Sequence, residues 1–113
     1  MKTVNERTGI ELTVSFFDRE ETPAIPVTAH WRLDCVTTGK VLQDWTEFAP
    51  IVNYDDLGNL SSVNAEVEVD AALNVIQKDQ NKREVKELTV SAALDTPREY
   101  AASVQYTVLN RRR

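Results

Sequence analysis

The sequence predicts an all-β domain in which two sheets pack face to face. Apolar residues recur at every second position over most of the chain, which is the spacing of a strand with one buried face. The chain has only three glycines and four prolines. Most of them lie between these runs, where the chain would turn. Several strands that each have one apolar face are not stable as a single flat sheet. Their apolar faces must therefore meet in a β-sandwich.

Length and composition are those of one globular domain. The chain has 113 residues, 42% of them hydrophobic and 27% charged, and a chain of this size buries about two thirds of its unfolded surface. We expect a single domain over residues 1–113, with short flexible ends at 1–7 and 110–113. No apolar run approaches the roughly 20 residues that cross a bilayer. The opening "MKTVNERTGIEL" lacks the apolar core of a signal peptide, so we expect synthesis in a cytoplasm and no membrane contact.

The first half of the chain predicts three strands. The apolar face of "GIELTVSFF" consists of Ile10, Leu12, Val14 and Phe16. The charged "DREETPAIP" that follows has two prolines and cannot be an interior strand. The apolar face of "VTAHWRLDCV" consists of Val27, Ala29, Trp31, Leu33 and Cys35. In "VLQDWTEF" the apolar residues fall on both parities, which a β-bulge would reconcile.

The second half predicts three more strands after an irregular loop at 49–62. The first has an apolar face of Val63, Ala65, Val67 and Val69. One short helical turn is expected near residues 71–75. The next strand has Leu88, Val90, Ala92 and Leu94 on one face, and the last has Tyr100, Ala102, Val104, Tyr106 and Val108. The "DTPRE" between these two strands is expected to be the bend of a hairpin.

Together these runs predict a single immunoglobulin-like β-sandwich of about six to seven antiparallel strands, since the turn signals have the spacing of such domains. A small closed barrel is the alternative. The expected core residues are Trp31, Leu33, Leu88, Val90 and Tyr106. Trp31 is expected at the centre, where its replacement by alanine would cost about 3–5 kcal/mol.

Residue types that carry chemistry are scarce in this sequence. Cys35 alternates with inward apolar residues, which is typical of a small buried hydrophobe. His30 lies at an odd offset from Cys35, so the two fall on opposite faces of one strand. Nucleophilic catalysis needs a nucleophile, a base and an orienting group, and the Cys and His count excludes the usual structural zinc site. We therefore expect no enzymatic activity, no catalytic residues, no cofactor and no metal.

One loop leaves two readings open. "NYDDLGN" at 53–59 places Asp55, Asp56 and Asn59 around a glycine, and oxygen-rich loops can hold calcium. The loop lacks the spaced acidic ladder and the final glutamate of an EF-hand. The sequence therefore favours a plain turn.

The charge of the chain favours a protein partner over nucleic acid. The net charge is −5, and nucleic-acid binding rewards clustered Lys and Arg. Glu66, Glu68 and Asp70 line one outward face of a strand. They either protect a solvated strand or form an interface with a basic partner, such as the tail of a neighbouring copy, which consists of Arg111, Arg112 and Arg113. The termini and the loops at 49–62 and 77–86 are further expected contact surfaces.

Several segments resemble a known class of small proteins. The matching features are Trp31 with Asp34, "TTG" at 37–39, "DW" at 44–45, "NKREV" at 81–85 and the Y-x-V-x-N pattern from Tyr106 to Asn110. From Leu12 onward the chain is similar to the immunoglobulin- or fibronectin-like proteins encoded among tailed-phage virion genes. These motifs are mostly core and turn residues.

The resemblance implies a structural role without chemistry. Such proteins are decoration, cement or head–tail accessory components of virions and are made in the host cytoplasm. The expected partners are other virion proteins, namely capsid or tail subunits, and the chain is expected to be a homo-oligomer or to act in multiple copies. The sequence shows no long extension that would lace across neighbouring subunits. The alternative is an adhesion or carbohydrate-binding module, for which Phe17, Trp45 and Tyr54 are candidate sugar contacts.

Overall fold

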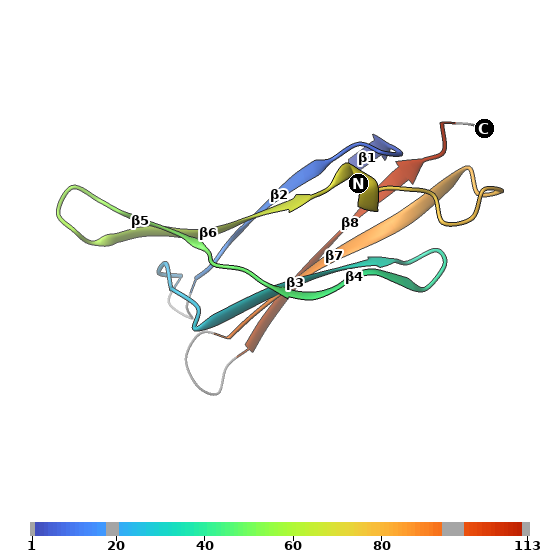
Figure 1. The fold of residues 1–113 in the computed structure, drawn as a ribbon. Coiled ribbons are helices and arrows are strands. Elements are labelled where there is room, and N and C mark those ends of the chain that lie inside the picture. Colours follow the sequence, from blue (N-terminus) through green and yellow to red (C-terminus); the bar gives the residue numbers. More distant parts are fainter. Residues whose placement is uncertain (1, 18–20, 94–98, 112–113) are drawn as a thin grey trace.

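The all-β sandwich is confirmed by a computed structural model, which describes residues 2–17, 21–93 and 99–111 (Figure 1). The described residues form eight strands, and the chain order is β1 Lys2–Asn5, β2 Ile10–Ser15, β3 Thr28–Cys35, β4 Lys40–Glu47, β5 Ile51–Tyr54, β6 Leu60–Val69, β7 Arg83–Ala93 and β8 Glu99–Leu109. One 3₁₀ turn, η1, covers Ala71–Leu73, close to the helical turn that the sequence predicts at 71–75.

The strands form two sheets, with orders β1-β8-β7-β3-β4 and β2-β6-β5. Four of the seven connections between successive described strands cross from one sheet to the other, whereas β3–β4, β5–β6 and β7–β8 stay within a sheet. Among the described strands, every pair is antiparallel except β1 with β8, which run parallel from Lys2↔Tyr106 to Asn5↔Leu109. The strand number is therefore eight, one or two more than the sequence predicts.

The core lies between the two sheets, where the apolar faces of both meet. Alternation in β6 and β7 places every second side chain inward, as the period-two pattern predicts. The buried members include Leu33, Val63, Ala65, Val67, Val69, Leu88, Val90, Tyr106 and Val108. Four of the five expected core residues are thus buried.

Trp31 is the exception among the expected core residues. It is half-buried and packs against the cluster from its margin, while Leu33 on the same strand is fully buried. The centre of the core is formed by residues such as Leu33, Leu88 and Tyr106. Val27 was also expected inward and is exposed, because β3 begins one residue later, at Thr28.

The two shortest strands fall in segments where the sequence predicts none. β1 occupies residues expected to be a flexible end, and Val4 packs against the core from it. β5 lies in the expected irregular loop at 49–62. Each strand has four residues, so alternation is too brief to be recognised. The expected flexible end at 110–113 begins with Asn110, which is buried and donates to the Asp79 and Asn81 carbonyls.

The pairing of β3 with β4 confirms the expected irregularity. The register shifts twice, between Trp31 and Leu33 and again before Asp34. These shifts turn Leu42 and Phe48 toward the core and leave Trp45 outside. β7 and β8 pair antiparallel over their full length, which confirms the expected hairpin. Residues 94–98, which include most of "DTPRE", lie outside the described residues.

The β5–β6 hairpin extends past the end of β2. β6 pairs with β2 only from Asn64 onward and with β5 from Leu60. Figure 1 shows this hairpin, in green, projecting from the rest of the sandwich. The molecule is accordingly elongated, with dimensions of 54 × 30 × 21 Å.

Candidate interaction surfaces

An acidic face covers the outside of the three-stranded sheet. We use this name for Glu11 of β2 with Glu66 and Glu68 of β6, all of which are exposed. Glu11 is the direct cross-strand partner of Glu68, and Glu66 lies opposite Thr13. Like charges directly opposite on a sheet destabilise it. The isolated domain therefore carries an unfavourable contact that a cation from a partner would relieve.

Asp70, which the sequence places in line with Glu66 and Glu68, has a structural role instead of a contact role. It follows β6 and accepts a hydrogen bond from the Ala72 amide at 3.2 Å, so its carboxylate caps the η1 turn. This local role explains an acidic residue here without a partner. Of the three acidic residues expected on one face, Glu66 and Glu68 therefore remain contact candidates, and Asp70 is a helix cap.

The expected basic tail is described only at its first residue. Arg111 is exposed directly after the anchored Asn110, while Arg112 and Arg113 lie outside the described residues. Their proposed contact with the acidic face of another copy stays a prediction.

The 53–59 loop is organised by one carboxylate. Asp55 Oδ1 accepts hydrogen bonds from the amides of Leu57 and Asn59, both at 2.9 Å. Gly58 adopts φ 82°, a conformation that glycine tolerates and other residues rarely adopt. One Asp55 oxygen is thus committed to an Asx turn of the chain itself. Among the described residues, no group of three His, Cys, Asp or Glu side chains is placed to hold a metal ion.

The three candidate aromatic residues for sugar binding lie on separate elements. Tyr54 ends β5 in the three-stranded sheet, and Phe17 follows β2 in a connection that bridges to Pro23. Trp45 is on β4 of the other sheet, 46% exposed, and its ring lies 5.9 Å from the Arg32 guanidinium carbon. Arg32 in turn makes a bidentate ion pair with Asp34, whose carboxylate helps to raise the Arg32 pKa. A shared aromatic platform is therefore not formed by these residues.

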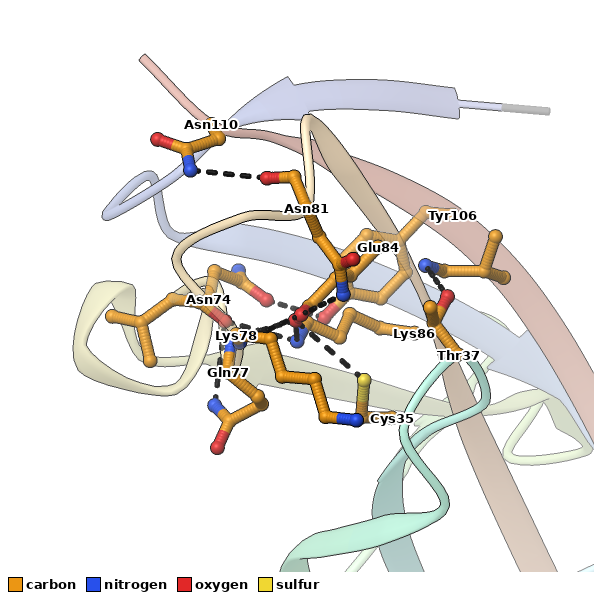
Figure 2. A network of polar contacts seen from close by, with 12 residues as sticks. Cys35, Thr37, Asn74, Gln77, Lys78, Asn81, Glu84, Lys86, Tyr106 and Asn110 are labelled. Atoms are coloured by element: carbon orange, nitrogen blue, oxygen red, sulfur yellow. Dashed lines mark hydrogen bonds and ion pairs between the residues drawn. The ribbon is translucent and has the colours of Figure 1, made fainter. Parts of the chain in front are cut away.

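The interior contains a polar network that the sequence analysis missed (Figure 2). Glu84 and Lys86 of β7 are both 0% exposed and form an ion pair at 3.0 Å. The Glu84 carboxylate also accepts from the Gln77 and Lys78 amides at 2.7 and 3.0 Å and from Asn81. Lys86 donates its other hydrogen bond to the Val75 carbonyl. The network fastens the 74–82 segment to β7.

A second part of this network joins the two ends of the chain. Asn74 is fully buried, accepts from the Tyr106 hydroxyl and donates to the Thr8 carbonyl at 2.7 Å. Its own carbonyl accepts from the Arg7 amide, and Arg7 adopts φ 62°. Burial raises the pKa of Tyr106, while its hydrogen bond to Asn74 acts against that rise.

The electrostatics of Glu84 follow from its donors. Burial alone would raise the pKa of this carboxyl, but the hydrogen bonds from Gln77, Asn81, Lys78 and Lys86 outweigh burial and lower the pKa to about 2. Glu84 is therefore ionised and Lys86 is its counter-charge. Cys35 completes the environment, with Sγ 3.7 Å from Glu84 Oε1 and no exposure. As expected, Cys35 is buried while His30, on the opposite face of β3, is only partly covered.

A groove runs between β2 and β8, the neighbouring margins of the two sheets. It consists of two adjoining hollows of about 260 and 140 Å³. Its apolar lining includes Leu12, Val14, Leu88, Val90, Ala102 and Val104. Val104 has the inward parity of Tyr106 and Val108, yet it is 41% exposed. The sandwich is therefore not closed along this margin.

Comparison with protein-family models, with curated proteins and with solved structures gives no match for this chain. Within the described part of the chain, no helix is long and apolar enough to cross a membrane.

Proposed function

We propose that the chain is a non-enzymatic structural component of a phage virion, either a capsid decoration or cement protein or a head–tail accessory protein. It acts through contacts with other virion proteins, is present in multiple copies and is made in the host cytoplasm. The resemblance of its strand and turn motifs to small virion proteins supports the setting. The acidic face supports the mode of action.

The cross-strand opposition of Glu11 and Glu68 is the observation that carries this proposal. Glu66 lies two residues from Glu68 on the same strand and points to the same side. Three carboxylates so placed raise the local negative potential. A basic surface of a capsid or tail subunit would remove the repulsion on binding and would gain charge-assisted hydrogen bonds.

Immunogold electron microscopy tests the setting. An antibody against the chain is expected to label the heads or tails of the phage particles whose genome encodes it. The label should remain with the particles through a density gradient. Label that stays in the particle-free fraction would contradict a virion role.

Charge reversal tests the contact. Glu66→Lys with Glu68→Lys is expected to lower the amount of chain bound to particles at least tenfold. A matched control, Asp44→Lys with Glu47→Lys, makes the same change in net charge at exposed positions of β4 in the other sheet and is expected to bind as the wild type does. Equal losses in both variants would mean that net charge alone governs binding, and no loss in either would remove the acidic face from the interface.

A further inference from the structure

One sheet margin is left open by the pairing of β1. β1 covers β8 only from Tyr106 to Leu109, and Figure 1 shows it beside the arrowhead end of β8. Among the described residues, no strand pairs with the outer side of β8 from Glu99 to Gln105. We call this segment the open edge. Its backbone donors and acceptors are a template for another strand.

The open edge lacks the protection that the edge strands β1, β4 and β5 have. β4 contains Lys40, Asp44 and Glu47 and has two register shifts against β3. β5 has four residues and a register shift, and β1 has four residues that include Lys2. Charges, bulges and brevity are the usual means of preventing strand addition. The open edge is unbulged and has no charge or proline from residue 100 to 105.

The groove beside the open edge is also uncovered by the residues that the structure describes. Ala102 and Val104 have the inward parity, but both are exposed, and none of the described strands occupies the neighbouring position in the sheet over residues 99–105. An added strand would occupy that position and would shield the apolar floor of the groove. An uncharged strand with small side chains fits it best, since charged groups would be desolvated there.

We propose that a second copy of this chain supplies the strand, so that two open edges pair antiparallel about a two-fold axis. With Ala102 on the axis, Ala101 of each copy lies opposite Ser103 of the other, and Glu99 lies opposite Gln105. This register uses the whole open edge and opposes no like charges. A two-fold contact of one edge with itself closes after two copies. The two five-stranded sheets then form one continuous sheet.

This inference deepens the proposed contact role by naming one partner, and it rests on that role but not on the virion setting. Native mass spectrometry over a hundredfold concentration range is expected to show a monomer and a dimer without larger species. A monomer throughout would overturn the self-pairing and would leave the labelling of particles as the separate test of the proposed function.

Complementary charges test the position of the contact. Ala101→Lys with Ser103→Lys places two Lys–Lys pairs across the axis, and Ala101→Glu with Ser103→Glu places two Glu–Glu pairs. Each double variant alone is expected to dimerise at least tenfold more weakly than the wild type. Mixing the two is expected to restore a heterodimer, because each like-charge pair becomes a Lys–Glu pair.

The control places the same charges on another edge. Ile51→Lys with Asn53→Lys changes two exposed β5 positions, also two residues apart, and is expected to dimerise as the wild type does. Circular dichroism shows that each variant is folded, and recovery on mixing is itself evidence of folding. Dimers that survive both Lys changes at the open edge, or variants that do not recover on mixing, would overturn the proposed pairing.

Discussion

At the scale of single residues, the Glu84–Lys86 pair stands out because both side chains are completely buried. Desolvation of two charges costs several kcal/mol, which such a pair recovers only when its remaining hydrogen-bonding positions are also used. Here the carboxylate has further donors in Gln77, Lys78 and Asn81. The pair therefore contributes little net stability, but its hydrogen bonds fix the 74–82 segment in one conformation over the core.

Replacing Glu84 by glutamine removes the charge and keeps the shape. Lys86 would then be a buried cation without a counter-charge, and we expect a loss of about 3–5 kcal/mol in the free energy of unfolding, measured by urea denaturation. The control is Glu87→Gln on the same strand, where the partly buried carboxylate accepts from Gln105 and where we expect a change of about 0.5 kcal/mol. Similar losses in the two variants would contradict the role given to the pair.

The pH dependence of stability has a defined sign. The pKa of Glu84 falls from 4.5 to about 2 on folding, so the stabilising effect of its ionised form is complete above the unfolded pKa and is lost as the pH falls through about 2. We expect the difference in stability between wild type and Glu84→Gln to be constant above pH 5 and to shrink between about pH 4 and 2. A difference that stays constant down to pH 2 would contradict the lowered pKa.

The buried pair also shows why some residues were missed in the sequence. Alternation correctly predicts Leu88 and Val90 as core residues, and the same alternation, continued toward the N-terminus, reaches Lys86 and Glu84. Charged residues are usually exposed, so alternation alone does not predict that these two are buried. Burial of a charge depends on donors from 77–81, which lie outside the strand and whose positions no strand pattern specifies.

At the scale of elements, the pairing of β2 with β6 places charge repulsion in an otherwise regular ladder. Glu68→Lys would convert the Glu11–Glu68 opposition into an ion pair. We expect it to stabilise the free domain by roughly 0.2–1 kcal/mol in thermal denaturation at low salt, with a smaller gain at high salt. A change at Glu66, opposite the neutral Thr13, is expected to gain less.

Glu68→Lys is thus expected to raise the stability of the free domain and to lower its binding to particles. If Glu68→Lys strengthened the isolated domain and also strengthened attachment to particles, the acidic face would not be a contact with a basic partner. If Glu68→Lys left the stability unchanged, solvent and ions would already screen the cross-strand repulsion. Relief of that repulsion could then not favour binding of a basic partner.

Element length also decided what the sequence could predict. β2, β6 and β7 have enough alternation to be recognised, and their inward faces are largely those expected. β1 and β5 depend on pairing with β8 and β6 instead of on a pattern of their own. The acidic face was expected from β6 alone, whereas Glu11 joined it only through the register with β2.

At the scale of the whole molecule, the projecting β5–β6 hairpin makes the domain extended. Its radius of gyration is 16.2 Å, whereas a compact chain of this length would have about 13 Å. The hairpin exposes Leu57 at its tip, where the side chain is 86% exposed. An elongated module with one sheet margin open can contact neighbours at several separate places.

Small-angle scattering tests this shape without depending on assembly. The Ala101→Lys, Ser103→Lys variant is expected to remain monomeric with a radius near 16 Å. The wild type at high concentration is expected to give a larger value, because pairing at the open edge lengthens the sheet. A variant radius near 13 Å would mean that the hairpin folds back in solution.

The parallel contact of β1 with β8 has a consequence for synthesis. A ribosome releases β1 first and β8 last among these strands, and β1 has its pairing partner in β8. β1 therefore remains without this partner until β8 has emerged. Contacts between residues so distant in sequence also slow folding. The earliest segment of this domain is thus expected to be among the last to reach its place, once β8 has left the ribosome.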